Sequence, residues 1–393
     1  MKKVRFGIVG LGAVGRQHAA AMASADSSRL EFSAVACAIP ENAHAAAEEY
    51  GVEHFHDAQE LFDSGCVDAV LIATPHYWHP PLAIRAARAG VHVLCEKPLA
   101  VTVGAARAMA AECRKRNVAL GVMFQQRHRP VMQTMRRMID EGQLGEVFRV
   151  EMICSGWIRT QAYYTSGAWR GTWNGEGGGV LMNQAPHSLD LFLWLGGVPR
   201  EVFGFCETRT HRIEVENTAE IICRYEGPRT GHIYVSTAHA PGGERLILAG
   251  DRGTLVADGD RLRFGKLAGP LGEHILTCPR AGSEEGAIDS TWEQVAVDPS
   301  ASADELRMAV VEAFAEHLRS GAPMTASAED GLNQTELTSA VYLSADRGVS
   351  AHLPVDADAI DNLLQQRAQA SAGDGPNLRS DALADLENLL SQG

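Results

Sequence analysis

The sequence predicts two domains of different architecture: an α/β domain built on a parallel sheet, followed by an α+β domain with a large, open and mainly antiparallel sheet. Strands alternate with helices up to about residue 123, and strand-like runs follow one another directly after about residue 145. The 393 residues are enough for about two to three domains. We expect the first domain to span 1–124 and the second 125–355, with a linker and a short amphipathic helix over 356–393.

The first domain begins with the apolar run 4–9, which leads through a glycine cluster into an alanine-rich helix over 14–23. Pro40 suits a helix start, and Gly51 and Gly90 suit helix ends. The further strands are expected at 31–37, 68–73, 91–95 and 118–123, and the further helices at 40–50, 81–89 and 102–116. Alternation of this kind indicates a parallel sheet with helices on both faces.

The second domain is predicted from runs with period-two character that are joined by Gly, Pro, Asp and Asn. The expected strands are 147–154, 201–207, 218–225, 232–238, 245–249 and 254–258, with helices at 184–195, 303–320 and 329–347 and a returning strand near 350–354. This pattern is typical of an antiparallel sheet with one covered face. The chain is small and polar from about residue 368, and apolar residues recur at helical spacing over 380–390. A docked helix and a solvated tail both fit that ending.

The composition excludes several classes of function. With 35 Lys and Arg against 49 Asp and Glu, the formal net charge is −14, which argues against a general nucleic-acid binder. No run approaches the ~18 apolar residues of a membrane span. The eight cysteines show no C-x-x-C spacing and indicate reduced thiols in a cytoplasmic protein. His54 and His56, and likewise His76 and His79, lack a third ligand nearby, so we expect no metal site.

Residues 10–15 read Gly-Leu-Gly-Ala-Val-Gly, directly after the first strand and at the opening of a helix. In this context the first glycine allows a tight turn, the second lets a pyrophosphate approach the backbone, and the third lets the helix pack on the strand. The helix N-terminus attracts the phosphate charge. We therefore interpret the first domain as a dinucleotide-binding Rossmann domain.

The sequence leaves the choice between NAD and NADP open. NAD-specific sites usually carry Asp or Glu at the end of the second strand, and here Ala38 takes that place. A 2′-phosphate would not be repelled by Ala38, which favours NADP, but no Arg or Lys lies beside it in the sequence. Glu41 could bind an NAD ribose if the turn is short. We expect NAD or NADP, with NADP favoured.

Two further segments carry candidate catalytic groups. Lys97 follows a parallel strand in the segment Cys-Glu-Lys-Pro-Leu, and ligands of open α/β sheets bind at such strand ends. Asn183 and His187 follow a triple glycine and are four residues apart, so a helical turn places them on one face. An imidazole can accept a proton near neutral pH. A lone Lys or His is more often structural, but beside the glycine loop the pair indicates a catalytic site.

Together these motifs resemble the glucose–fructose oxidoreductase/inositol dehydrogenase (Gfo/Idh/MocA) family over residues 3–355. Ala-Thr-Pro-His-Tyr-Trp-His at 73–79 is similar to that family's A-T-P-x-x-x-H segment, and Trp169-Arg170 is similar to its W-R pair. The resemblance implies an NAD(P)-dependent dehydrogenase that oxidises a secondary ring hydroxyl of a sugar, glycoside or cyclitol, or runs the reverse reduction. An open sheet with an apolar outer face must be covered, which predicts a homodimer or homotetramer.

The resemblance also implies roles for single residues. Lys97 and His187 would form the catalytic pair, Lys97 stabilising an alkoxide and His187 accepting its proton. The implied cofactor ligands are Gly10, Gly12, Ala13, Val14, Ala38, Thr74, His79, Glu96, Lys97, Trp169 and Arg170. The expected substrate ligands are Lys97, Asn183, His187, Arg127, Arg159 and Tyr163, a mixture of donors and aromatic faces that suits a polyhydroxylated ring. Asn183 stands where the family often has Asp and cannot exchange a proton, so it would only orient ligands.

Two alternatives stay open. Some members of the family retain NAD, oxidise their substrate transiently, eliminate and reduce again, with net glycoside cleavage. A non-catalytic dinucleotide-binding protein of the same fold would turn nothing over, although the presence of Lys97 and His187 argues against it. Turnover of added cofactor separates a dehydrogenase from both.

Overall fold

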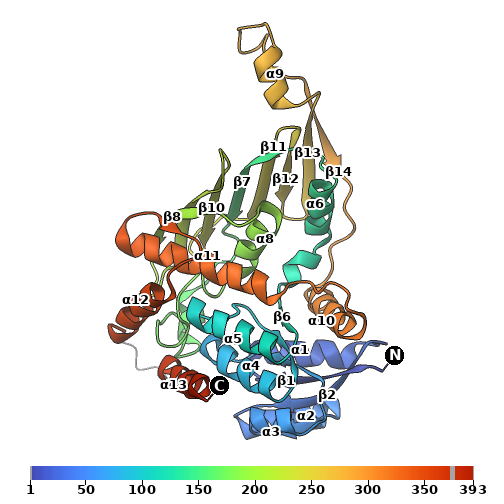
Figure 1. Ribbon diagram of the computed structural model, residues 1–393, viewed down its shortest axis with the longest axis vertical. Helices are drawn as coiled ribbons and strands as arrows, with labels where there is room; N and C mark the ends of the chain where they lie inside the picture. The colour runs from blue at the N-terminus through green and yellow to red at the C-terminus, as the bar shows by residue number, and fades with distance from the viewer. Residues whose placement is uncertain (1, 372–376, 393) are drawn as a thin grey trace.

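The computed structural model describes residues 2–371 and 377–392, and it confirms the two predicted sheets (Figure 1). The first sheet has six parallel strands in the order β3-β2-β1-β4-β5-β6. This is the strand order of a dinucleotide-binding fold, whose ligand crevice lies outside the carboxyl ends of the strands, where the order reverses between β1 and β4. Its elements are β1 (Val4–Val9), α1 (Ala13–Ser24), β2 (Leu30–Ala36), α2 (Pro40–Tyr50), β3 (Glu53–Phe55), α3 (Ala58–Asp63), β4 (Ala69–Ile72), η1 (His76–Trp78), α4 (His79–Arg88), β5 (His92–Cys95), α5 (Val103–Lys115) and β6 (Leu120–Val122).

Local sequence explains most of these elements. Every residue of β4 is buried, because helices cover both faces of a parallel sheet. Pro40 begins α2, and Gly51 ends it in the left-handed conformation. Asp57 and Thr102 cap α3 and α5 by accepting a backbone hydrogen bond. The sequence pattern does not predict β3 and α3, because such short segments show no period.

The second sheet has nine strands in the order β14-β13-β12-β11-β7-β10-β9-β8-β15, all antiparallel except the pair β7 and β10. The elements after β6 are η2 (Gln125–His128), α6 (Pro130–Asp140), β7 (Val147–Cys154), α7 (Gln161–Thr165), α8 (Pro186–Gly196), β8 (Glu201–Glu207), β9 (Thr218–Arg224), β10 (Thr230–Ser236), β11 (Glu244–Gly250), β12 (Gly253–Asp258), β13 (Arg261–Leu267), α9 (Leu271–Thr277), β14 (Ser290–Val295), α10 (Ala303–Ser320), α11 (Ala328–Arg347), β15 (Ala351–His352), α12 (Ala357–Gln369) and α13 (Leu378–Ser391).

Several of these elements lie outside the predicted set, for different reasons. β14 is exposed along nearly its whole length and shows no alternation. By contrast, α6 buries apolar residues at helical spacing, so its sequence does contain a signal for a helix. The C-terminal extension begins with α12 rather than with a linker, and part of the expected linker, 372–376, lies outside the described residues. The predicted terminal helix is α13, which is docked on α4 and η1.

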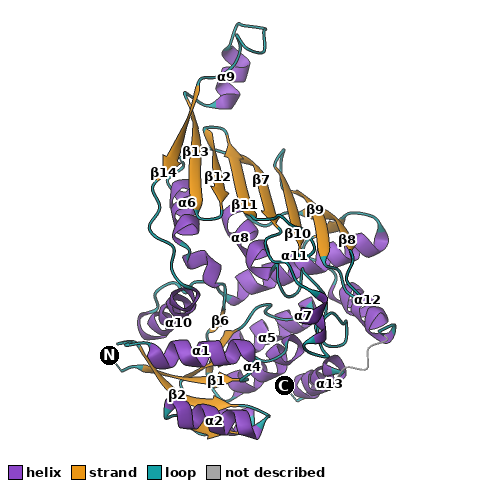
Figure 2. Ribbon diagram, turned by 180° about the vertical axis from the view of Figure 1, so that it is seen from behind, coloured by secondary structure: helices purple, strands orange, loops and turns teal. Residues whose placement is uncertain are grey.

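The two faces of the second sheet differ. One face packs on α6, α8 and α11 in the main hydrophobic core, whereas the other is open (Figure 2). Phe205, Ile222 and Trp292 are each more than half exposed, with relative exposures of 54%, 54% and 55%. The chain also returns to the first sheet, because Phe314 of α10 packs edge-on against Phe6 of β1 at 6.2 Å. The two sheets are thus tied by helices as well as by the segment after β6.

Candidate active site

The loop between β1 and α1 has the geometry of a phosphate-binding site. Gly10 has a φ of +96°, and a Cβ there would lie 2.8 Å from the Ala73 carbonyl oxygen. A Cβ on Gly15 would overlap the Gly10 carbonyl oxygen, whereas no atom of the described residues lies within 4 Å of one on Gly12. Gly12 caps α1 without a side-chain bond, and the first turn carries no acid. The backbone N–H groups beside Ala13 and Val14 are therefore open to an anion.

A cavity of about 410 Å³ continues from this loop along the ends of β1, β2 and β4. Gly10, Ala38 and Thr74 line it, so the structure brings together three of the predicted cofactor ligands. The Thr74 hydroxyl is buried, and no described residue pairs with it. An unpartnered hydroxyl beside an open glycine loop fits a ligand that supplies hydrogen-bonding groups, such as a dinucleotide. The residues present therefore fit the cofactor that the glycine motif indicates.

Arg16 adds a cation that sequence reasoning missed. Its Nη2 atom donates to Asn42 Oδ1 at 2.7 Å, which places the guanidinium beside the turn that follows Ala38. Arg16 belongs to α1 and reaches this turn only through the packing of α1 beside α2. No local sequence signal links it to Ala38.

Glu96 lies at the end of β5 and is already held on both carboxylate oxygens. Oε1 is 2.6 Å from Nε2 of the buried His18, and Oε2 accepts the Lys97 backbone N–H at 3.0 Å. Burial works against the charge of Glu96, but His18 and the nearby Lys97 lower its pKa to about 2. The residue is therefore an anion at neutral pH, and it fixes the backbone that presents Lys97.

Lys97 meets the triple-glycine segment across the interface between the domains. Its Nζ atom donates to the Asn183 carbonyl oxygen at 2.6 Å and lies 3.4 Å from Asn183 Oδ1. Asn183 Nδ2 in turn donates to Glu176 Oε1. Burial lowers the pKa of Lys97 and raises that of Glu176, and each charge works against the shift of the other. Glu176 is only 1% exposed, so this site contains a buried carboxylate that the sequence analysis missed.

A second cavity of about 410 Å³ opens beside Lys97. Five predicted substrate ligands line it together: Lys97, Arg159, Tyr163, Asn183 and His187. Its other lining residues are Gln126, Arg129, Trp157, Gln184 and Glu244. Arg159 stacks on Tyr163 with its guanidinium carbon 4.8 Å from the ring centre, and its Nε atom has no partner among the described residues. The cavity thus offers donors and aromatic faces next to the β5 end of the first sheet.

His187 is neutral at ordinary pH. Burial and the charge of Lys97 lower its pKa to about 3, far below the neutral range expected from the sequence. Its Nδ1 atom is buried without a partner in the described part of the chain, and its ring packs edge-on against Phe124. A neutral imidazole with a free nitrogen is the form that can accept a proton.

As with Glu96, neither of these cavities is lined by the predicted ligands Arg127, His79, Trp169 or Arg170. Arg127 is the clearest correction: it is 4% exposed, does not line the cavity, and donates to Asp190 and Asp330 in an internal ion pair. His79 is fully buried, with one ring nitrogen 2.9 Å from the Pro98 carbonyl oxygen and the other 3.0 Å from that of Thr74. It joins the two loops that follow β4 and β5 rather than lining a cavity.

Trp169 and Arg170 line neither cavity, but they extend from the second domain towards the loop after β4. The Trp169 ring lies 6.0 Å from that of His76. Arg170 stacks between Trp169 and Tyr163, and its Nη1 atom donates to the Tyr163 hydroxyl at 2.5 Å. Arg170 therefore positions a side chain of the second cavity.

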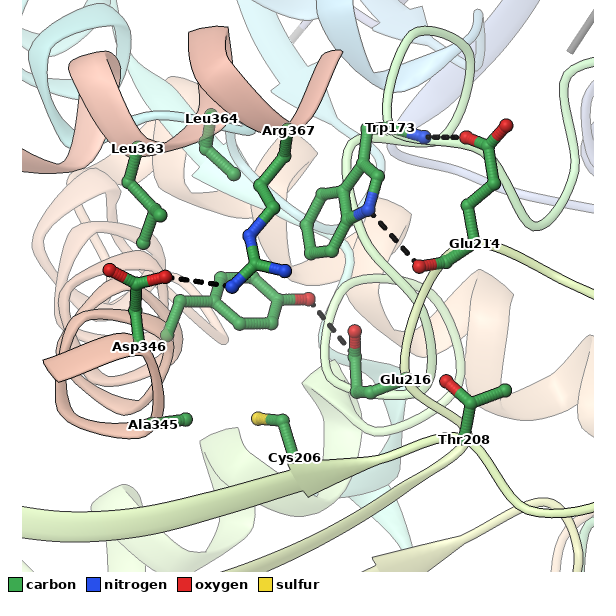
Figure 3. Close-up of a pocket in the computed structure, with 11 residues that line it drawn as sticks. Trp173, Cys206, Thr208, Glu214, Glu216, Ala345, Asp346, Leu363, Leu364 and Arg367 are labelled. Atoms are coloured by element: carbon green, nitrogen blue, oxygen red, sulfur yellow. Dashed lines mark hydrogen bonds and ion pairs between the residues drawn. The ribbon is translucent and has the colours of Figure 1, made fainter. Parts of the chain in front are cut away.

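Glu216 lines a third cavity (Figure 3). Its side chain also binds the backbone of the triple-glycine segment. Its Oε1 atom accepts from Gly179 N at 3.1 Å, Leu181 N at 3.0 Å and the Tyr342 hydroxyl at 3.0 Å. Gly179 is obligatory, because a Cβ there would lie 1.7 Å from the Glu216 carbonyl oxygen. Burial raises the pKa of Glu216 to about 7.

Glu216 should therefore make the stability of the protein depend on pH. In the folded protein the pKa of Glu216 lies above its ordinary value. The contribution of this residue to folding stability is therefore complete below about pH 4.5 and is lost as the pH rises through 7. Glu216→Gln keeps the accepting oxygen but cannot ionise. The free energy of unfolding of the variant minus that of the parent should therefore increase between pH 5 and pH 8, by up to about 3 kcal/mol. Urea unfolding at both pH values measures this, and parallel pH profiles of the two proteins would contradict it.

Both domains match known family models. Residues 4–124 match the family model described as "Oxidoreductase family, NAD-binding Rossmann fold", and residues 132–256 match "GFO/IDH/MocA C-terminal domain". The rhizopine catabolism protein MocA of Rhizobium meliloti is 31% identical over 301 residues, which are 74% of this chain and 91% of that protein. Inositol 2-dehydrogenase of the same species (strain 1021) is 33% identical over 195 residues, 49% of this chain and 55% of that protein.

Among solved structures, the WlbA dehydrogenase of Bordetella pertussis in complex with NADH and UDP-GlcNAcA superposes with a TM-score of 0.75 at 29% identity. The match covers 90% of this chain and 100% of the other. Within the described residues, no helix is both long and apolar enough to span a membrane. No three His, Cys, Asp or Glu side chains of that part of the chain form a metal site.

Proposed function

Because the chain belongs to the Gfo/Idh/MocA family of NAD(P)-dependent oxidoreductases, we propose that it oxidises a secondary ring hydroxyl of a sugar, glycoside or cyclitol, or reduces the corresponding ketone. One observation carries the proposal. Lys97 and His187, from different domains, line one cavity at the β5 end of the parallel sheet, among donors and aromatic faces suited to hydroxyl groups.

The proposed chemistry follows from the charges of these two residues. Oxidation of a secondary alcohol removes a proton from oxygen and a hydride from carbon, and the bound nicotinamide supplies the hydride acceptor. The Lys97 ammonium donates to the substrate oxygen and stabilises the developing alkoxide. Neutral His187 accepts the proton. As negative charge develops on the substrate oxygen it compensates Lys97, which removes one cause of the low His187 pKa and makes the imidazole more basic at that moment.

Asn183 and Glu176 position Lys97 in this proposal. Because Asn183 Nδ2 donates to Glu176, the amide oxygen is turned towards Lys97 Nζ. The Glu176 carboxylate also favours the charged form of Lys97 against its burial. The carboxylate that the family often carries at the position of Asn183 is thus supplied from seven residues earlier in the chain, behind Asn183.

The direct test is reduced-cofactor absorbance with NAD or NADP added separately, against inositols, free pyranoses and glycosides. A rise with one class of substrate is expected. A flat trace over the whole panel, in both directions, would contradict the proposal and favour a retained-cofactor glycosidase or a binding protein. Cleavage of a glycoside without added cofactor then distinguishes these two, because a binding protein would turn nothing over.

The pH profile of oxidation should reflect the buried state of His187. An imidazole with its ordinary pKa would lose activity below about pH 6.5. Since burial and Lys97 lower the pKa of His187 to about 3, kcat/KM should show no acid limb from His187 between pH 8 and pH 5. The measurement is kcat/KM against pH, with circular dichroism as the control for folding. A limb near pH 6.5 that disappears in His187→Gln would contradict this expectation.

For the cofactor, we propose that NADP is favoured, because Ala38 does not repel a 2′-phosphate and Arg16 lies beside the same turn. Ala38→Asp should lower the ratio of kcat/KM for NADP over NAD by about tenfold or more, since the new carboxylate repels the phosphate and accepts from ribose hydroxyls. Arg16→Ala should raise KM for NADP about tenfold and leave NAD nearly unchanged. The exposed Arg137→Ala is the matched control. A parent that prefers NAD, with no response to either change, would contradict the choice.

We further propose a homodimer or homotetramer formed through the open sheet face. Phe205, Ile222 and Trp292 are exposed there. The helix α9 projects beyond the sheet (Figure 1), and Ile275 and Leu276 near its end are exposed. Burying such an apolar face in a symmetric contact is the usual solution. Light scattering of the parent and of Ile222→Asp tests this assembly.

A further inference from the structure

The C-terminal helix α13 is fixed on the first domain by specific contacts with α4 (Figure 1). Leu386 is buried in the core of that domain, and Arg88 Nη2 donates to the Leu389 carbonyl oxygen at 2.6 Å. One turn earlier on α4, Arg85 Nη2 donates to Asp385 Oδ1. α13 is therefore a docked part of the first domain, although it is the last helix of the chain.

Through Asp385, α13 forms part of the wall of the cavity that Gly10, Ala38 and Thr74 line. The remaining wall is mainly apolar, with Pro75, Trp78 and Leu82 among its members. In this fold the adenosine half of a dinucleotide binds on the β1–β2 side, next to the end of β2. A mainly apolar slot with a few polar groups at this place suits a purine ring.

The second carboxylate oxygen of Asp385 has an unusual environment. Oδ2 is buried, and no donor among the described residues reaches it, because Arg85 is bonded to Oδ1. A buried carboxylate oxygen without a donor is costly, so a ligand that enters this cavity gains by supplying an N–H group. The exocyclic amino group is the donor that adenine offers at its edge.

We propose that Asp385 accepts a hydrogen bond from the 6-amino group of the cofactor's adenine. The helix α13 would then contribute a residue that recognises the base in the dinucleotide site. The inference rests on the dinucleotide cofactor of the proposed function. It assigns to the C-terminal extension a role in selecting adenine over bases that carry an acceptor at that position.

The test uses the full chain and two probes, NADH and reduced nicotinamide hypoxanthine dinucleotide, with Kd measured by calorimetry. The two probes differ in the base, where hypoxanthine has a carbonyl oxygen in place of the 6-amino group and a hydrogen on N1. The parent should bind the adenine form about tenfold or more tightly. In the other form the 6-carbonyl oxygen would face Asp385 Oδ2, and both atoms are acceptors. In Asp385→Asn, Oδ1 still accepts from Arg85, and an amide N–H replaces Oδ2.

The variant should therefore bind NADH less tightly and the hypoxanthine form more tightly than the parent, so that the preference falls to near unity or reverses. Asp381→Asn, an exposed residue one turn earlier on α13, should leave the preference unchanged. Equal binding of both probes by the parent, or an unchanged preference in Asp385→Asn, would overturn the inference and leave the proposed function intact. Failure of the parent to bind either probe or its 2′-phosphate form would instead contradict the proposed function.

Discussion

Lys97→Met is expected to reduce kcat/KM for oxidation by about 10²–10³-fold or more, because it removes the charged donor for the developing alkoxide while keeping a side chain of similar length. The dinucleotide Kd should change little, since Lys97 does not line the cavity that Gly10 and Thr74 line. The loss should appear mainly in kcat, because the interaction is strongest in the transition state.

The same variant has a second readout. The charge of Lys97 is one cause of the low pKa of His187, so its removal should raise that pKa, which a histidine NMR titration can follow. Lys266→Met, an exposed residue of β13, serves as the matched control. Near-parental turnover in Lys97→Met, with the His187 titration unchanged, would mean that neither the catalytic nor the electrostatic role is correct.

Glu176→Gln is the second change for which we expect a large effect. It keeps the shape of the side chain but removes the buried carboxylate that orients Asn183 and faces Lys97. Gly171 N, which donates to Glu176 Oε2 at 2.6 Å, would then meet either an amide oxygen or an amide N–H, so one of the two bonds is lost. We expect kcat to fall about tenfold to a hundredfold, with a smaller change in KM.

The pH profile separates this positioning role from simple loss of structure. Glu176 raises the pKa of Lys97 against its burial, so its removal should lower that pKa further. Activity requires the charged form of Lys97 in the proposed mechanism, and its alkaline limb should therefore move to lower pH in Glu176→Gln. Glu176→Asp should restore the position of that limb in part. A uniform loss of kcat with an unmoved limb would indicate a structural role only.

Much of the fold could be predicted because its signals are local. The strand-to-helix alternation, the glycine loop and the four-residue spacing of Asn183 and His187 are all patterns within a short stretch of chain. Where a segment had no period, as in β14, or was very short, as in β3, the pattern contained nothing to detect. In α6, by contrast, apolar residues recur at helical spacing, so its sequence does contain a helical signal.

Residue roles were harder to predict because they depend on which side chains meet across the fold. Arg127 has the donors that would suit a sugar-binding residue. In the structure it donates instead to Asp190 and Asp330, which neutralise its charge in the interior. Glu176 stands beside the triple glycine in the sequence, yet the role proposed for it depends on Asn183 and Lys97, which come from two domains.

The sequence by itself determined the two-domain class and the dinucleotide loop and predicted the pair Lys97 and His187, because each depends on residue type and spacing within one element. Only the tertiary structure decided that Asn183 donates to Glu176, that Arg16 reaches the turn after Ala38, and that Asp385 lines the cavity beside the glycine loop. Arg85 and Asp385 are 300 positions apart, and no local pattern specifies a partner at that separation. Such pairs form when packing brings the elements together and burial requires each polar group to find its partner.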